Sequence, residues 1–168
     1  GGLGQLVKAR KLKHLRGYAR ITGANSLQVE LVEGGAQALQ FDHALLASGS
    51  RPALPGIFAI DDERIMDSTS ALALKDVPAS LLVVGGGIIG MELGQVYAAL
   101  GSAVSVVEMM HGLVPPADRD LVKPLQTRVE QQFPDIWLNT KVTKIAAGDT
   151  GIEVHFESPD GQIFSKTF

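Results

Sequence analysis

The chain has 168 residues, with 15 Lys plus Arg, 18 Asp plus Glu, a formal net charge of −3, 45% hydrophobic residues and no cysteine. This length and apolar fraction suit one globular domain or two small ones and exclude a disordered or collagen-like chain. The missing cysteine excludes a disulfide framework, a thiolate metal site and a thiol nucleophile within these residues. The small net charge provides no field that would attract nucleic acid or an anionic membrane.

The first portion of the chain predicts a helix end followed by a small antiparallel sheet. Residues 3–13 have the pattern of a helix with a basic face, which we interpret as solvated rather than as a nucleic-acid contact. Turn residues then separate short alternating runs, which are typical of a meander, at 14–21, 27–32 and 38–41. Residues 43–47 predict another buried strand, and residues 67–70 predict a helix start before 71–74.

The stretch 79–107 contains a single ionisable group, Glu92, and is long enough to span a bilayer. Three consecutive glycines divide it, however, and Glu92 near the bilayer centre would cost about 2.5–3.5 kcal/mol. We therefore interpret it as a buried strand at 80–84, a glycine turn, a helix at 90–100 and a second buried strand at 103–107. Since no targeting or transmembrane segment is recognised, we expect a cytoplasmic protein without a membrane partner.

The turn in this stretch has the G-x-G-x-x-G spacing, at Gly85, Gly87 and Gly90. Gly85 permits the tight turn, Gly87 lets the backbone approach a pyrophosphate, and Gly90 removes a side chain where the helix meets the strand. Gly94, one turn later, extends that close packing. A diphosphate would then lie on the unpaired backbone N–H groups at the start of the helix.

An acidic residue, Glu108, follows the second strand 18 residues after Gly90. A carboxylate at that place accepts hydrogen bonds from the ribose hydroxyls of an adenosine and repels a 2′-phosphate, which predicts NAD rather than NADP. Two alternatives stay open. The ADP portion of a flavin could use the same fingerprint, and a Gly-rich turn with a solvated Glu108 also occurs in ordinary α/β domains.

The rest of the chain completes an α/β pattern. An amphipathic helix is predicted at about 119–133, strands at 136–138 and 141–147, and a last hairpin from 152–156 with 163–168. The predicted fold class is α/β, with a Rossmann-like domain built from a parallel sheet, helices and a β-meander. Because the chain stops within a strand, we expect a fragment of a longer protein.

Three segments carry a resemblance to a known family: LLVVGGGIIGMELG (81–94), VVEMMHGLVPPADRDLVKPL (106–125) and FDHALLASGSRPALPGI (41–57). They resemble the two-dinucleotide flavoprotein disulfide reductases, the pyridine nucleotide-disulfide oxidoreductases. The segments LRGYARITGAN (15–25) and WLNTKVTKI (137–145) are similar to the dihydrolipoamide dehydrogenase subgroup. The resemblance implies that 1–78 is part of an FAD-binding domain and that 79–168 is an NAD-binding domain truncated before its last strand.

The family's site residues are carried over by position. For NAD, the resemblance implies a diphosphate-binding turn, a ribose acid, an acid facing the nicotinamide side and a residue whose backbone lies by the adenine. In that order these are Gly85, Gly86, Gly87, Ile88, Ile89 and Gly90, then Glu108, Glu92 and Val142. For FAD, it implies a backbone contact to the adenine at Ala19 and a closing motif at Ser48 and Gly49. Ser48 stands where the family more often has Thr, and the hydroxyl is retained.

For the whole protein, the resemblance implies an oxidoreductase that reoxidises dihydrolipoamide through a redox disulfide and FAD and passes a hydride to NAD. Its implied partners are lipoyl domains of 2-oxo-acid dehydrogenase complexes and the second subunit of a homodimer. The family's first FAD fingerprint, redox disulfide and His-Glu acid/base pair have no counterpart in this sequence. We therefore expect a central fragment that binds NAD, has no catalytic residue of its own and does not retain FAD.

Two other functions stay open. One is a related FAD-dependent disulfide reductase or a pyridine nucleotide transhydrogenase, and the other is a non-catalytic nucleotide-binding module. No metal site is predicted, because the four histidines are scattered without the spacing of a zinc site; they are His14, His43, His111 and His155.

Overall fold

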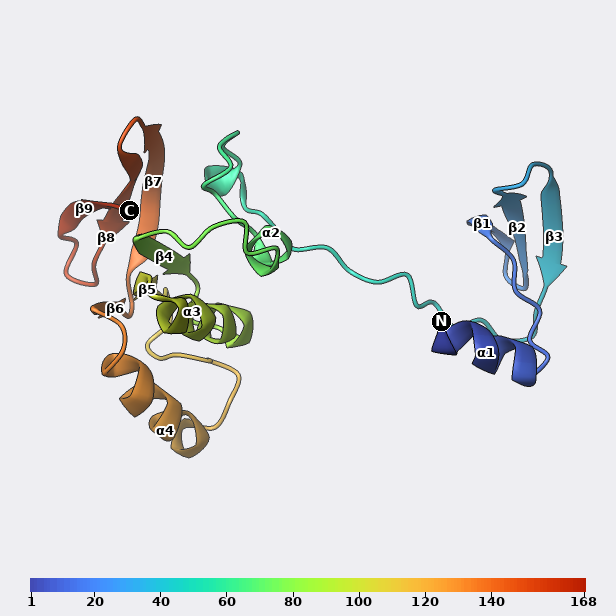
Figure 1. Ribbon diagram of the computed structural model, residues 1–168, viewed down its shortest axis with the longest axis horizontal. Coiled ribbons are helices and arrows are strands. Elements are labelled where there is room, and N and C mark those ends of the chain that lie inside the picture. The colour runs from blue at the N-terminus through green and yellow to red at the C-terminus, as the bar shows by residue number, and fades with distance from the viewer. The chain divides into compact units, whose positions relative to one another are not determined.

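The computed structural model describes residues 1–168 as two compact units, Gly1–Ser50 and Arg51–Phe168 (Figure 1). Residues 51–78 belong to the second unit, so the units divide earlier than the expected domain boundary after residue 78. One reason is the buried Tyr97, whose hydroxyl donates a 2.8 Å hydrogen bond to the carbonyl oxygen of Ala71. The assignment of 1–78 to an FAD domain and of 79–168 to an NAD domain stays a prediction.

The first unit is a helix and a three-stranded antiparallel meander, as the turn spacing predicts. The strands lie in the order β1-β2-β3, and Val29 of β2 is buried. The helix buries no residue. It is shorter than the predicted helix at 3–13, because it ends at Ala9. The bounds are α1 Gly2–Ala9, β1 Gly17–Gly23, β2 Ser26–Leu31 and β3 Ala36–Gln40.

The predicted buried strand at 43–47 is wrong. This segment has no strand partner, and the side chains of Leu45 and Leu46 are 93% and 77% exposed. A buried strand needs neighbours on both sides to satisfy its backbone groups. The apolar run supplies the side chains for such a strand, but this chain supplies no strand to pair with it.

The second unit contains the predicted strand, glycine turn, helix and strand. The parallel strands lie in the order β4-β5-β6, and a separate antiparallel sheet has the order β7-β8-β9. The helical bounds are η1 Gly56–Phe58, α2 Ser68–Leu72, α3 Ile88–Leu100 and α4 Arg119–Glu130. The strand bounds are β4 Ser80–Val84, β5 Ala103–Val107, β6 Asp135–Trp137, β7 Lys141–Gly148, β8 Gly151–Glu157 and β9 Ile163–Thr167.

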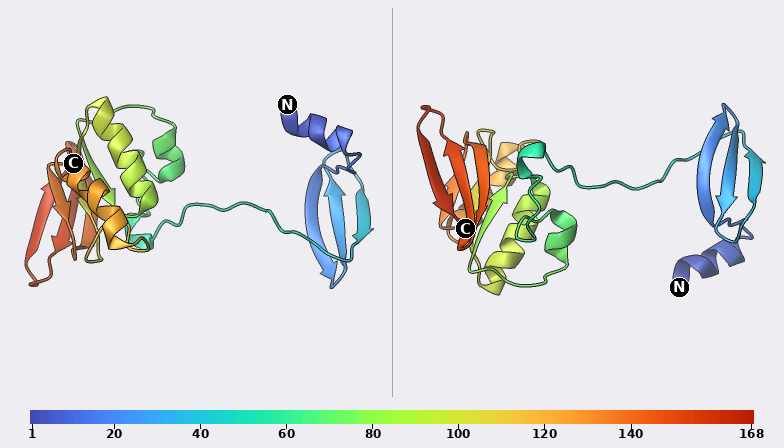
Figure 2. Two further views of the ribbon diagram at one scale, coloured as in Figure 1. Left: turned by 90° about the horizontal axis from the view of Figure 1, so that it is seen from below. Right: turned by 90° about the horizontal axis from the view of Figure 1, so that it is seen from above.

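Three layers make up the second unit, with the parallel sheet in the middle (Figure 2). Alternate residues of its strands face opposite layers, because side chains alternate along a strand. Leu81 and Val83 pack in the cluster that contains the buried residues of α3 and α4, whereas Leu82 packs against β7–β9. This arrangement explains why β4 and β5 read as continuous apolar runs rather than as alternating ones.

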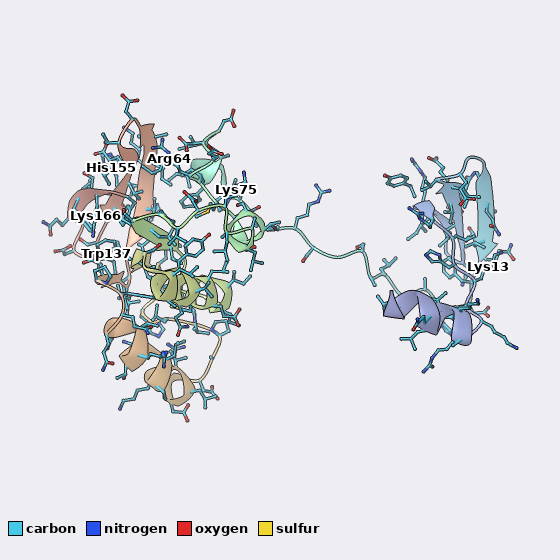
Figure 3. All side chains as sticks on the ribbon, in the orientation of Figure 1. Lys13, Arg64, Lys75, Trp137, His155 and Lys166 are labelled. Atoms are coloured by element: carbon cyan, nitrogen blue, oxygen red, sulfur yellow. The ribbon has the colours of Figure 1, made fainter.

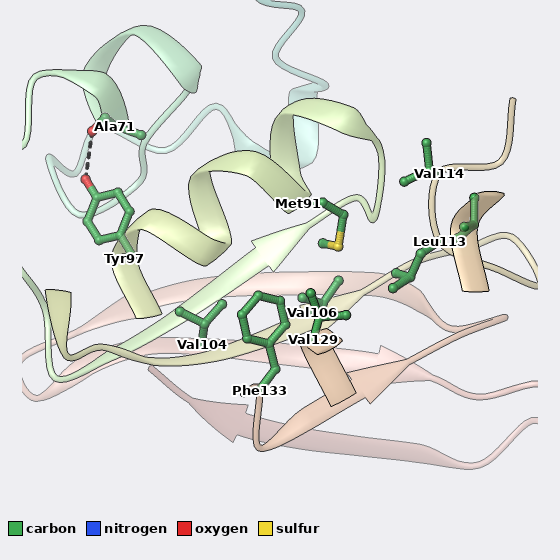
Figure 4. Packing of buried hydrophobic residues seen from close by; sticks show 10 residues of the cluster. Ala71, Met91, Tyr97, Val104, Val106, Leu113, Val114, Val129 and Phe133 are labelled. Atoms are coloured by element: carbon green, nitrogen blue, oxygen red, sulfur yellow. Dashed lines mark hydrogen bonds between the residues drawn. The ribbon is translucent and has the colours of Figure 1, made fainter. Parts of the chain in front are cut away.

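The helix cluster centres on Met91, Tyr97, Val104 and Phe133 (Figure 4). Not every apolar residue of these helices is buried. Val96 and Leu100 of α3 are 43% and 51% exposed, because α3 is covered only along the side that carries its buried residues, Met91, Gly94 and Tyr97. In α4 the buried residues are Val122 and Val129, whereas Leu121 is 71% exposed.

The second cluster joins the two sheets of this unit through aromatic side chains. Trp137 of β6 lies 5.0 Å from Phe156 and 5.7 Å from Phe164 between ring centroids. Lys166 lies 5.4 Å above the Trp137 ring and donates a 2.6 Å hydrogen bond to Asp135 (Figure 3). The end of the chain is thereby packed against β6. None of the helices is both long and apolar enough to cross a bilayer.

Candidate functional site

The candidate site lies at the carboxyl ends of β4 and β5, where parallel α/β sheets bind ligands. The glycine turn, Gly85–Gly90, follows β4, and Gly85 has a φ of 105° that favours glycine. The N–H of Gly85 donates a 2.8 Å hydrogen bond to the carbonyl oxygen of Val107, the last residue of β5. The turn is therefore tied to the neighbouring strand at its first residue.

Two glycines of α3 bring the helix close to the sheet. A Cβ at Gly90 would overlap the carbonyl oxygen of Gly85, and a Cβ at Gly94 would lie 3.3 Å from the ring of Phe133 and 3.5 Å from Val83. The absence of both side chains lets the first turns of α3 pack on the end of β4. These contacts confirm the close packing expected at Gly90 and Gly94.

Gly87 differs from its neighbours, because a Cβ built on it would meet nothing within 4 Å. It is the N-cap of α3 and has extended backbone, with no side chain capping the helix. The first N–H groups of a helix have no partner inside the helix. Open space and unpaired donors at a helix start suit an anionic group such as a diphosphate.

The carboxylate of Glu108 is held beside this turn by two backbone donors. Gly86 N–H donates to Oε2 and Met110 N–H donates to Oε1, each over 2.7 Å. Glu108 itself is buried, with 9% of its surface exposed. A carboxylate has about four acceptor positions, so two remain for other donors. The side chain is thus fixed with acceptor capacity to spare.

The β5–α4 loop, residues 109–118, folds back over the glycine turn. Val114 N–H donates a 2.7 Å hydrogen bond to the carbonyl oxygen of Gly86. Leu113 is fully buried, and Figure 4 shows its side chain within the cluster that contains Met91 and Val106. A Cβ at Gly86 would lie 2.6 Å from the Cδ2 atom of Leu113. This contact explains why the middle glycine, which the fingerprint does not require, has no side chain.

Val142 lies near the same edge through the start of β7. It is buried and pairs with Phe156, and two residues earlier the N–H of Thr140 donates 3.0 Å to the carbonyl oxygen of Glu108. The register shifts directly after Val142. Such irregularities bend a strand and redirect its backbone groups.

The other residues expected at the NAD site lie on the first turns of α3. Ile88 and Ile89 are 60% and 58% exposed, and Glu92 is exposed one turn further along.

The residues expected to bind FAD lie in the first unit. Ala19 is in the middle of β1, paired with Val29, whereas Ser48 and Gly49 follow the meander in an exposed segment. No hydrogen bond joins Ala19 to Ser48 or Gly49.

Sequence reasoning missed the residues that hold Glu108 and its loop in place. These are Gly86, as a donor and as a contact of Leu113, together with Met110, Val114 and Arg119. Backbone donors carry no signal in the sequence, and only the doubled proline before α4 marks this loop as unusual. No group of three or more acidic or His side chains is arranged to hold a metal ion.

The chain is similar to known proteins over most of its length. The family described as pyridine nucleotide-disulphide oxidoreductase matches residues 5–165. A dihydrolipoyl dehydrogenase of Vibrio parahaemolyticus is 46% identical over 157 residues, which are 94% of this chain and 33% of that protein. A dihydrolipoyl dehydrogenase of Haemophilus influenzae has the same identity and coverage. The chain thus spans about a third of the length of these curated relatives.

Solved structures show the same fold. The Cu(II) complex of the HOCl-induced flavoprotein disulfide reductase RclA from Escherichia coli superposes with a TM-score of 0.70 at 30% identity, over 89% of this chain and 33% of that one. LpdA from Mycobacterium tuberculosis superposes with a TM-score of 0.74 at 22% identity, over 98% of this chain and 38% of that one. The second likeness concerns the fold alone.

Proposed function

The chain belongs to the pyridine nucleotide-disulphide oxidoreductase family, and from this premise we propose that it binds NAD(H) at the glycine turn and Glu108. The observation that carries the proposal is the position of the Glu108 carboxylate, which Gly86 N–H holds beside the turn over 2.7 Å. One dinucleotide could then place its diphosphate on the start of α3 and its adenosine ribose on Glu108.

The open space at Gly87 supports the diphosphate position. A ligand must approach the backbone there, and a Cβ at Gly87 would occupy space that no protein atom fills within 4 Å. Ile88 and Ile89 follow at the helix start and contribute backbone N–H groups. Glu92 on the same helix and the backbone of Val142 remain the proposed neighbours of the nicotinamide side and of the adenine.

Charge supports NAD rather than NADP. A 2′-phosphate would approach the buried Glu108 carboxylate and be repelled by it. Arg119 lies nearby in sequence, but its side chain already donates hydrogen bonds to the loop carbonyls of Leu113, Val114 and Ala117. The Arg119 guanidinium is therefore already engaged and is not available for a 2′-phosphate.

We propose that the whole protein is a dihydrolipoyl dehydrogenase that uses FAD and NAD. The support is the 46% identity to dihydrolipoyl dehydrogenases over 94% of this chain. Its partners would be lipoyl domains of 2-oxo-acid dehydrogenase complexes and a second subunit. In such an enzyme the bound cofactors supply the hydride chemistry, and the residues of this chain bind and orient them.

The part played by the first unit is proposed on the same basis. Ala19, Ser48 and Gly49 would contact FAD within the whole protein, and the chain by itself would not retain it. The chain has no cysteine and therefore no redox disulfide. It should not reduce NAD with dihydrolipoamide even when FAD is added, and measurable turnover would contradict this assignment.

The direct test is a titration of the purified chain with NADH and with NADPH, followed by nucleotide fluorescence or calorimetry. NADH is expected to bind more tightly than NADPH. Tighter binding of NADPH would overturn the assignment of Glu108 to the ribose, and binding of neither nucleotide would overturn the site itself.

A further inference from the structure

The side chain of Arg119, the first residue of α4, holds the β5–α4 loop by hydrogen bonds to the backbone carbonyls of the loop. Its guanidinium donates four hydrogen bonds: Nη1 to Leu113 O over 2.9 Å, Nη2 to Val114 O and Ala117 O over 2.7 and 2.8 Å, and Nε to Ala117 O over 3.3 Å. A charged donor that reaches several carbonyls at once gives strong and directional contacts. The loop is therefore fastened at three of its residues by one side chain.

The fastened loop contains a strained residue. Val114 has a φ of 44°, a left-handed conformation that a β-branched side chain rarely adopts. It is held from both sides, because its carbonyl oxygen accepts from Arg119 and its N–H donates 2.7 Å to the carbonyl oxygen of Gly86. Strain of this kind persists only where surrounding contacts impose it, and it clusters at functional sites.

The same contacts lead to Glu108. Val114 is held against Gly86, and the neighbouring Leu113 is buried against the glycine turn. The carbonyl oxygen of Gly86 thus accepts from the loop, while its N–H donates to the Glu108 carboxylate. The start of the loop supplies the second donor, Met110 N–H. Glu108 is thus held by the glycine turn, against which Arg119 fastens the middle of the loop, and by Met110 at the start of the same loop.

We propose that Arg119 is a positioning residue for nucleotide discrimination. By holding the β5–α4 loop on the glycine turn, it keeps Glu108 at a fixed place relative to the start of α3, where one NAD molecule would contact both. Preorganisation of this kind raises affinity by removing the cost of ordering the site upon binding. This inference rests on the proposed NAD site, and Arg119 itself does not contact the nucleotide.

The stability of α4 does not account for the placement of Arg119. A cation in the first turn of a helix interacts unfavourably with the helix dipole, whereas a cation in the last turn interacts favourably. Arg119 occupies the first turn, and Arg128 occupies the last. Removing the charge of Arg119 should favour the isolated helix, and removing that of Arg128 should disfavour it. The two arginines therefore form a matched pair for a test.

The experiment compares Arg119→Gln and Arg119→Lys with the control Arg128→Gln in the full 168-residue chain. Arg128 is exposed, and none of the hydrogen bonds in the structure uses its side chain. In Arg119→Gln, NADH should bind about tenfold more weakly, because the released loop must be ordered upon binding, while NADPH binding stays the same. Arg119→Lys should recover part of the loss, and Arg128→Gln should match the parent.

A second readout needs no nucleotide. Amide hydrogen exchange should show that Val114 N–H loses its protection in Arg119→Gln while the amides of β4 and β5 keep theirs. This measurement separates the inference from the proposed function. If the parent chain binds neither nucleotide, the NAD site fails, and the exchange of Val114 still shows whether Arg119 fastens the loop.

Gly112 provides an independent way to displace the guanidinium. A Cβ at Gly112 would lie 2.6 Å from Nη1 of Arg119, so Gly112→Ala should push this side chain away from the loop. Gly112→Ala should reproduce the change in the ratio of NADH to NADPH affinity and should add nothing in the Arg119→Gln background. An unchanged ratio in Arg119→Gln, equal effects of Arg119→Gln and Arg128→Gln, or full protection of Val114 would each overturn the proposal.

Discussion

The buried carboxylate of Glu108 and the backbone N–H of Gly86 are joined by a 2.7 Å hydrogen bond across 22 positions of the sequence. The bond connects the residue that follows β5 with the turn that follows β4. It makes the glycine turn and the acid one preformed structure. Substitutions at either end should therefore affect both stability and nucleotide preference.

Glu108→Arg should narrow or reverse the preference for NADH over NADPH. The substitution removes the acceptor for the ribose hydroxyls and supplies a cation for a 2′-phosphate. The measurement is the ratio of the two dissociation constants. Glu108→Gln serves as the control, because it removes the charge without adding a cation; it should weaken NADH binding without producing tight NADPH binding. An unchanged ratio in Glu108→Arg would show that Glu108 does not face the ribose.

Gly86→Ala should destabilise the chain through its contact with Leu113. The added methyl group would lie 2.6 Å from Leu113 Cδ2, and crowding of a packed site costs about 1–3 kcal/mol. Leu113→Ala alone should cost about 2–5 kcal/mol through the cavity that it leaves. The free energy of unfolding of the double variant should show a coupling of about 0.5–3 kcal/mol, with the new methyl group partly filling that cavity. Additive losses would argue against this contact.

Gly87→Ala and Gly90→Ala should separate ligand binding from folding. A Cβ at Gly87 meets nothing, so stability should change by no more than about 1 kcal/mol while NADH binding is lost. A Cβ at Gly90 would collide with the Gly85 carbonyl, so stability should fall markedly. Thermal unfolding and NADH titration of both variants make the comparison. Normal NADH binding by Gly87→Ala would contradict the diphosphate position.

Asp62 should titrate well below an ordinary aspartate. Hydrogen bonds from the Arg64 side chain, then from its backbone, lower the pKa of Asp62 from 3.8 to about 2. Because the folded pKa is depressed, the pair's contribution to stability is present above the unfolded pKa and is lost as the pH falls from about 4 towards 2. NMR titration of the carboxyl carbon should show this value. In Arg64→Gln the pKa should rise only part of the way, since the backbone N–H of residue 64 still donates; no rise at all would contradict the assigned cause.

Pro124→Ala should stabilise the chain. Pro124 lies inside α4, where it lacks the N–H that would bond to the carbonyl four residues earlier. Replacing it with Ala should gain about 2 kcal/mol, which is the helix penalty of proline reduced by the greater freedom of the unfolded chain. Urea denaturation measures the change, and Lys123→Ala, at the exposed neighbouring position, is the control. A loss of stability would contradict this account of Pro124.

Much of the second unit follows from local sequence patterns. The runs SLLVV and AVSVV form the predicted strands, the glycine spacing forms the predicted turn, and Glu108 lies beside that turn. These features can be predicted because strand and helix periods and turn residues act within a few positions of the chain. The first unit's meander follows for the same reason. The roles of Val142, Ala19, Ser48 and Gly49 came from family resemblance and stay predictions.

Only the tertiary structure decided how the site is held. The sequence determined that a glycine turn and an acid would meet at one edge of a parallel sheet. It did not determine that Gly86 and Met110 N–H groups would hold the two oxygens of Glu108, or that Arg119 would bind the loop carbonyls. Nor did it reveal that residues 43–47, a buried strand by composition, would lack a partner. The physical reason is the same in each case: backbone donors, carbonyls and strand neighbours are available at every position, and only the folded chain determines which of them meet.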